Sequence, residues 1–144
     1  MASILTPDIK RIMLADYLDE LARTKWQWGL CDCTQAVSMW IDCCHGVDPF
    51  AQFHYCNAEE ARALVKRHGG FVCKIGQVLD EYGFERTQTY EDGDVAIITA
   101  PHALANCMPV IGAIMAIRFN GLWVMKALHG IAGRSLPVVS AWRI

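Results

Sequence analysis

Apolar side chains recur at helical spacing through the first half of the chain. Residues 8–23 carry an apolar stripe with charged side chains between its members, the pattern of an amphipathic helix. The segments with this pattern are 8–23, 33–44, 57–68 and 72–82. Gly46 and Gly83 follow two of them and are suited to ending a helix. The chain up to about residue 83 is therefore predicted to be helical.

Short apolar runs separated by turn residues make up the second half. The runs are 84–88, 95–98, 110–119, 122–125 and a C-terminal stretch from 137. Asn120-Gly121, between two of these runs, is the strongest hairpin signal in the sequence. Helices followed by strands predict an α+β fold, with a helical N-terminal half packed on a C-terminal antiparallel sheet. We expect one domain over residues 1–144.

The overall composition favours a well-filled core. Hydrophobic residues make up 53% of the chain and charged residues 19%, which is also compatible with a face that docks on another protein. A net charge of −2 gives no electrostatic case for binding nucleic acid. No apolar run reaches the roughly 18–20 residues of a membrane span. Pro7 and Asp8 precede a charged helix, so we expect no secretion signal and synthesis in the cytoplasm.

The seven cysteines do not form a recognisable framework. Their odd number and irregular spacing argue against a set of disulfides. Two close pairs, Cys31/Cys33 and Cys43/Cys44, are too tightly spaced for the usual zinc-binding knuckles. We therefore predict no metal and no other cofactor. A redox or metal protein built on Cys31 and Cys33 is the least favoured interpretation.

The stretch from Trp26 to Gln35 is the most distinctive part of the sequence. Cys33 stands at the start of a predicted helix, where the helix dipole favours a thiolate, so it is a candidate nucleophile. Alternatively, Cys33 is a small buried apolar group and Asp32 is simply the helix N-cap. Trp26 and Trp28 are either walls of a substrate groove or anchors of the core.

Several short motifs occur in a familiar order. Trp28-Gly29, Asp32-Cys33 and the run Gly93–Ile98 together resemble the NlpC-type papain-like cysteine peptidases, which cut the stem peptides of bacterial cell wall. Trp-Gly-x-x-Asp-Cys, Gly-Asp-Val-Ala and a terminal Ala-Trp-Arg-Ile more narrowly resemble uncharacterised proteins encoded among the tail genes of tailed phages and prophages. The resemblance follows nearly the whole chain in element order.

This resemblance implies a papain-like fold in which Cys33 is the nucleophile. Its histidine base would stand near Pro109 or Val110, and neither is a histidine. The polar residue that orients the base would stand near Met125 or Lys126, and neither is of the expected type. Because a cysteine nucleophile needs a base within hydrogen-bond reach, the catalytic set is incomplete at the expected positions.

Other histidines could substitute for the missing base. His102 lies seven positions before Pro109 and could fold back toward Cys33, although a solvated loop side chain is the alternative. His129 follows the second strand of the hairpin and could orient a partner. His45 and His68 stand at predicted helix C-termini, where a local structural role is expected.

Two functions follow from the resemblance. In the first, the chain is a structural protein of the phage tail tip with a degenerate catalytic set, located in the virion tail and bound to hub, distal tail or fibre proteins. In the second, it is an active peptidase or amidase that acts on host peptidoglycan during DNA entry. Cys33 and His102 would then be catalytic with His129 assisting, and the substrate would lie beside Trp26, Trp28 and Asp32.

Overall fold

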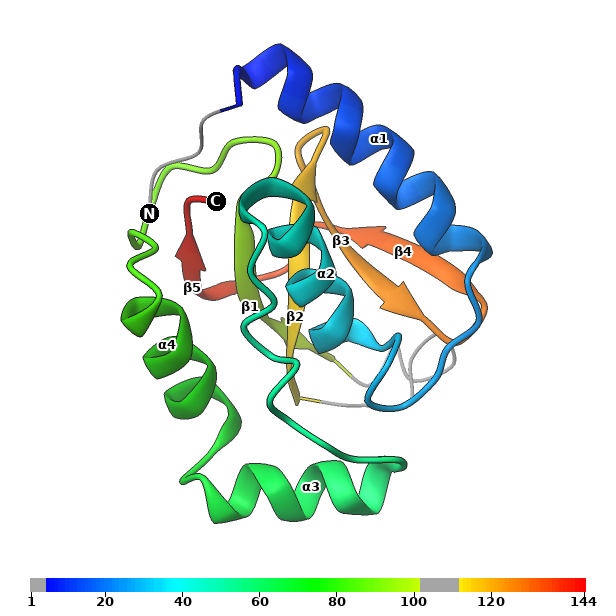
Figure 1. Cartoon of the computed structure of the whole chain (residues 1–144), viewed down its shortest axis with the longest axis vertical. Coiled ribbons are helices and arrows are strands. Elements are labelled where there is room, and N and C mark those ends of the chain that lie inside the picture. Colours follow the sequence, from blue (N-terminus) through cyan, green and yellow to red (C-terminus); the bar gives the residue numbers. More distant parts are fainter. Residues whose placement is uncertain (1–4, 102–111) are drawn as a thin grey trace.

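A computed structural model describes residues 5–101 and 112–144. Four helices come first: α1 (Pro7–Arg23), α2 (Cys33–His45), α3 (Ala58–Arg67) and α4 (Phe71–Glu81). Five strands follow in the described residues: β1 (Val95–Ala100), β2 (Gly112–Phe119), β3 (Leu122–Ala127), β4 (Gly130–Arg134) and β5 (Val138–Trp142). The predicted α+β organisation, helices first and strands afterwards, is confirmed (Figure 1).

The strands form one antiparallel sheet in the order β4-β3-β2-β1-β5. Helix α2 packs across the central strands β2 and β3, whereas α1 contacts the edge strand β4 (Figure 1). Helix α3 lies away from the sheet and is joined to the rest by the segments on either side of it (Figure 1). The helix that begins at Cys33 is therefore the central helix of the fold.

The two faces of the sheet bury different side chains. One face, which includes Ile97 and Met115, packs against the helices in the larger core cluster. The opposite face is rich in alanine and surrounds Trp123, which is 2% exposed. The apolar residues of α2 that are buried belong to the first cluster, except Cys33, which joins the second. Cys33 therefore lies where α2 meets the sheet.

Local signals in the sequence placed most elements within a residue or two. Thr6 and Asn57 are the N-caps of α1 and α3, and each side chain accepts a hydrogen bond from a backbone N–H in the first turn. The hairpin at Asn120-Gly121 is also confirmed. Both residues have positive φ, 51° and 77°, as a two-residue type I′ turn requires.

Two strand predictions differ from the structure. Residues 84–88 form no strand, and only Arg86 makes an isolated bridge, to Trp142 of β5. Strand β4 was not predicted, because its sequence Gly-Ile-Ala-Gly-Arg has two glycines and little alternation. It forms because the preceding turn brings it beside β3, with Met125 opposite Ala132. Pairing of β4 with β3 here outweighs the weak strand preference of the β4 sequence.

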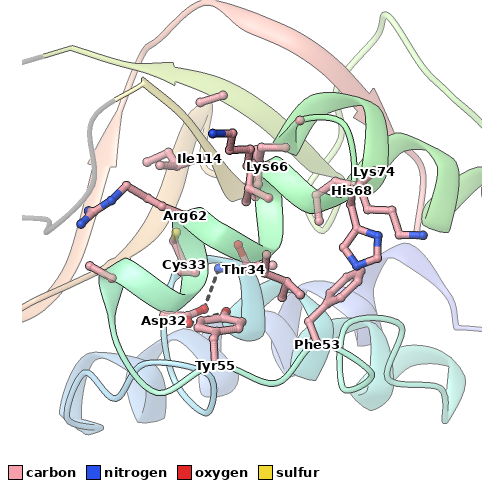
Figure 2. A pocket seen from close by; sticks show the side chains of 18 of the residues that line it. Asp32, Cys33, Thr34, Phe53, Tyr55, Arg62, Lys66, His68, Lys74 and Ile114 are labelled. Atoms are coloured by element: carbon pink, nitrogen blue, oxygen red, sulfur yellow. Dashed lines mark hydrogen bonds between the residues drawn. The ribbon is translucent and has the colours of Figure 1, made fainter.

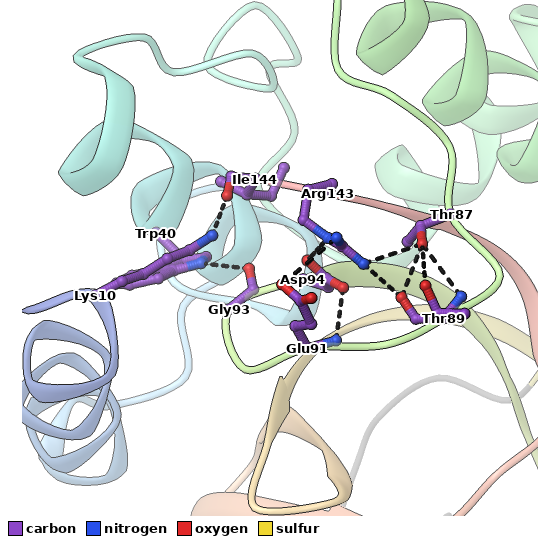
Figure 3. Close-up of polar contacts among 9 residues, drawn as sticks. All are labelled: Lys10, Trp40, Thr87, Thr89, Glu91, Gly93, Asp94, Arg143 and Ile144. Carbon is purple, nitrogen blue, oxygen red and sulfur yellow. Dashed lines mark hydrogen bonds and ion pairs between the residues drawn. The ribbon is translucent and has the colours of Figure 1, made fainter. Parts of the chain in front are cut away.

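An ion pair between a buried carboxylate and a half-exposed arginine joins the turn before β1 to the C-terminus. Asp94 is fully buried, and its Oδ1 accepts a hydrogen bond from Arg143 Nε at 3.0 Å while its Oδ2 accepts one from the Glu91 N–H at 2.8 Å (Figure 3). Burial raises the pKa of Asp94, and Arg143 opposes that rise. Beside it, Trp40 Nε1 donates to the Gly93 carbonyl at 2.9 Å. The Gly93-Asp94 turn and the C-terminal residue Arg143 thus stabilise each other.

Replacing Arg143 with methionine should lower the free energy of unfolding by about 2 kcal/mol, measured by urea denaturation. The change leaves the buried Asp94 carboxylate without its cation, and the partial exposure of Arg143 keeps the loss below that of a fully buried pair. The matched control is Arg23→Met, which breaks the exposed Arg23–Asp19 pair and should cost less than about 0.5 kcal/mol. Equal losses in the two variants would contradict a structural role for the Asp94 pair.

Candidate functional site

Asp32 accepts hydrogen bonds from the first turn of α2 and from two neighbouring loops. Its Oδ1 accepts hydrogen bonds from the N–H groups of Thr34 and Gln35, at 3.1 and 2.8 Å. Its Oδ2 accepts from the Gly29 N–H at 2.9 Å and from the Tyr55 hydroxyl at 2.6 Å. The side chain is almost fully buried, with each oxygen already bound by two donors. Asp32 is therefore an N-cap that also ties two loops to the helix.

Gly29 lets one of these loops come close to another. Its φ is +78°, and a Cβ atom at this position would lie 2.0 Å from the carbonyl oxygen of Tyr55. Any side chain would push apart the segment before α2 and the segment before α3. In the Trp-Gly-x-x-Asp-Cys motif, Asp32 and Gly29 thus have a packing explanation for their residue types.

Cys33 is the first residue of α2, and its side chain is 7% exposed. Burial raises the pKa of the Cys33 thiol to about 12, and the neighbouring Asp32 carboxylate contributes to that rise. Hydrogen bonds with Met115 and Thr34 oppose the rise without offsetting it. Desolvation therefore raises the pKa of Cys33, opposite to the lowering expected at a helix start, and favours the neutral thiol.

An apolar cavity of about 600 Å³ lies beside Cys33 (Figure 2). It is bounded by the start of α2, the inner side of α3, the first turns of α4 and the first residues of β2. Leu64, Phe71 and Ile75 supply part of its apolar wall, and Tyr55 lies near Cys33. Its size falls within the range of ligand-binding pockets. The start of α2 thus borders a space that a bound group could fill.

The described part of the sheet offers no base to Cys33 within this cavity. The β2 residues that line it are Ala113 and Ile114, neither of which can accept a proton. Among the described histidines, His68 is the one that lines the cavity. Its ring packs against Phe53 at 5.9 Å, on the other side of the view from Cys33 (Figure 2). No described hydrogen bond joins Cys33 to an imidazole, so the described residues contain no Cys–His pair.

The two candidate histidines do not complete the site in the described part of the chain. His129 is exposed in the turn between β3 and β4 and does not line the cavity. His102 lies outside the described residues. Lys126, where the resemblance places an orienting group, is buried and donates to the carbonyls of Leu21 and Gly130 at 3.2 and 3.0 Å. It therefore faces α1 and β4.

The two tryptophans before the helix have different positions. Trp28 lines the cavity together with Asp32 and Cys33. Trp26 packs edge-on against Trp28, with ring centroids 5.2 Å apart, and contacts the alanine-rich cluster of the sheet. Among the residues predicted for the site that the structure describes, it thus brings Trp28, Asp32 and Cys33 to the cavity. Trp26 does not line the cavity but packs against Trp28. His129 lies in the turn between β3 and β4.

Other kinds of site have no basis in the described residues. No group of three or more His, Cys, Asp or Glu side chains there is arranged to hold a metal ion. The six cysteines in the described ranges are all unpaired. None of the helices between residues 5 and 101 is both long and apolar enough to cross a bilayer. The cavity beside Cys33 is therefore the strongest candidate site in this part of the chain.

Comparison with known proteins gives one match. A family model described as a domain of unknown function, DUF6950, matches residues 8–144. The chain belongs to the DUF6950 family. No curated protein and no solved structure matches it significantly. The DUF6950 match covers the helices and strands described above, from the first turn of α1 to the residue after Arg143.

Gly29→Ala should destabilise the protein by more than about 3 kcal/mol in urea denaturation, because positive φ and a clash with Tyr55 act together. The matched control is Gly46→Ala at the end of α2. Gly46 has a similar φ of +70°, but a Cβ there meets nothing within 4 Å, so the loss should be about 1 kcal/mol. Similar losses would show that backbone strain, not the close approach, makes Gly29 necessary.

Cys33 should react slowly with iodoacetamide at about pH 8. A pKa raised from 9.0 to about 12 reduces the thiolate fraction about a thousandfold, and burial restricts access. Mass spectrometry of digested protein should show Cys33 labelled at least about a hundredfold more slowly than the exposed Cys73. Denatured protein should label both equally, as a control. Labelling of Cys33 at the rate of Cys73 or faster in the folded protein would reveal an activated thiolate.

Proposed function

We propose that the chain is a non-catalytic, NlpC-like structural protein of the phage tail tip. The observation that carries the proposed loss of catalysis is that the described β2 residues beside Cys33, Ala113 and Ile114, supply no base. Pro109 and Val110, where the resemblance places the base, are not histidines and lie outside the described residues. A buried neutral thiol without a base has no means of attacking a peptide carbonyl. What Cys33 contributes instead is packing between α2 and the sheet.

The assignment to the tail rests on the motif resemblance, together with a surface suited to binding. The motifs that resemble those of the tail-cluster proteins have structural partners in this fold: Gly29 and Asp32 at the start of α2, and Asp94 with Arg143 at the C-terminus. These contacts maintain the architecture without requiring catalysis. The apolar cavity beside Cys33 then serves to contact hub, distal tail or fibre proteins.

A second candidate function is cleavage of peptidoglycan stem peptides, with Cys33 as nucleophile and His102 as base. The observation that favours it is that Cys33, Asp32 and Trp28 border the same cavity, as a nucleophile and its substrate groove would. The raised pKa of Cys33 weighs against it, because such a thiol needs a strong local base to ionise.

A direct assay separates the two candidates. Purified protein and its Cys33→Ala variant should both release no stem peptides from purified peptidoglycan, as measured by chromatography and mass spectrometry. Circular dichroism should show that the variant is folded, since the substitution removes one sulfur atom from a helix start. Release by the wild type that Cys33→Ala abolishes would establish the peptidase and overturn the non-catalytic proposal.

Location is tested independently of catalysis. Mass spectrometry of purified particles of the phage that encodes the chain should detect it, in an amount comparable to other tail-tip proteins. Disruption of the gene should give particles that lack the chain and fail to infect. Intact, infectious particles that never contain the chain would overturn the tail assignment.

A further inference from the structure

Three cations around the cavity have no partners among the described residues. Arg62 and Lys66 of α3 and Lys74 of α4 all line it. The five ion pairs of the described residues are formed by other cations: Arg11, Arg23, Arg86 and, twice, Arg143. No described hydrogen bond involves the charged ends of the three cavity cations. Their charges are therefore available to an external anion.

The acids near the cavity do not neutralise these cations. Asp32 is the one carboxylate among the described lining residues, and its oxygens are already bound by four donors. Glu60 of α3 is outside the lining and accepts from the Cys56 N–H at 2.6 Å. The cavity therefore combines an apolar interior with a net positive rim.

The start of α4 adds positive potential at one end. Gly70, its N-cap, makes no side-chain cap bond, and the first turn contains no acidic residue. Gly70 and Phe71 both line the cavity, so the uncapped end of the helix borders it. Lys74 stands in the same turn and is half-buried. A carboxylate there would interact with both the helix dipole and the ammonium group of Lys74.

Helix α3 covers its apolar stripe only in part, through Leu64 against the larger core cluster. None of its residues is buried, although Ala58, Ala61, Leu64 and Val65 line the cavity. In an amphipathic helix this stripe would normally pack against a core. Here it faces a space of about 600 Å³, so an apolar occupant would complete the packing of the helix.

From these features we propose that the cavity binds an acidic peptide segment of a partner protein, with apolar side chains between its carboxylates. Arg62 of α3 and Lys74 of α4 lie on opposite sides of the view in Figure 2, so the positive charge is spread along the cavity. A polypeptide with acids on each side of an apolar centre matches this charge pattern, whereas a fatty acid has a single anionic end. The inference rests on the proposed function, since it names the chemistry of the tail partner at this site.

Selection from a library of short randomised peptides tests the charge pattern directly on the purified wild-type chain. Peptides that bind it should be enriched in Asp and Glu on both sides of large apolar residues. A fluorescently labelled consensus peptide then gives the affinity by polarisation, which should weaken as salt is raised. Dodecanoate is the probe for a small amphiphile, and sedimentation monitors self-association of the chain.

Variants locate the binding. Combined Arg62→Ala, Lys66→Ala and Lys74→Ala should weaken binding of the consensus peptide at least about tenfold. Ala61→Trp, which fills the cavity from the exposed helix α3, should abolish it. The matched control is Arg67→Ala, on the same helix but outside the lining, which should change the affinity less than about twofold. Thermal unfolding should confirm that all variants are folded.

Several results would contradict binding of an acidic peptide. Enriched peptides that lack acids, equal binding by the triple variant, or no peptide binding at all would overturn the proposal. Binding of dodecanoate but of no peptide would assign the cavity to a small amphiphile, and self-association lost in the triple variant would assign it to a second copy of the chain. Because peptide binding uses purified protein, its failure is distinct from absence of the chain from phage particles.

Discussion

The carboxylate of Asp32 is the interaction on which the arrangement around α2 depends. A buried charge is costly unless donors surround it, and here four donors come from three separate segments of the chain. These four hydrogen bonds together fix the start of α2, the turn at Gly29 and the position of Tyr55. The location of Cys33 and one wall of the cavity follow from the same contacts.

The burial that strengthens this cap also suppresses the reactivity of Cys33. In a low-dielectric setting, hydrogen bonds to Asp32 gain strength, while ionisation of the adjacent thiol loses solvation and is opposed by the Asp32 charge. An active cysteine would need a cation or a base nearby to reverse this balance. Among the described residues of β2 beside Cys33, Ala113 and Ile114 supply neither. Within the described residues, burial therefore opposes the ionisation of Cys33.

The short motifs gain their meaning from distant partners. Asp94 belongs to a strand motif in the sequence, yet its carboxylate is held by Arg143 at the far end of the chain. Gly93 likewise accepts a hydrogen bond from Trp40 in the central helix. Motifs of this kind can arise from contacts that stabilise a fold as well as from catalytic residues. Similar motifs can therefore occur in active enzymes and in structural proteins.

The sequence by itself determined the elements whose causes are local. Helical spacing, the caps at Thr6 and Asn57, and the turn at Asn120-Gly121 depend on neighbours within a few residues. Asp32 as an N-cap and Cys33 at the first turn of α2 were predicted on the same grounds.

Only the tertiary structure decided the features that join distant segments. Strand β4 exists through its pairing with β3. The pKa of Cys33 depends on its burial in a cluster with sheet residues far along the chain, such as Ile114. The cavity and its cations are likewise assembled from α2, α3, α4 and β2, which no local pattern brings together. Desolvation and charge proximity depend on distances in space, so spacing along the sequence could place Cys33 at a helix start but not establish its reactivity.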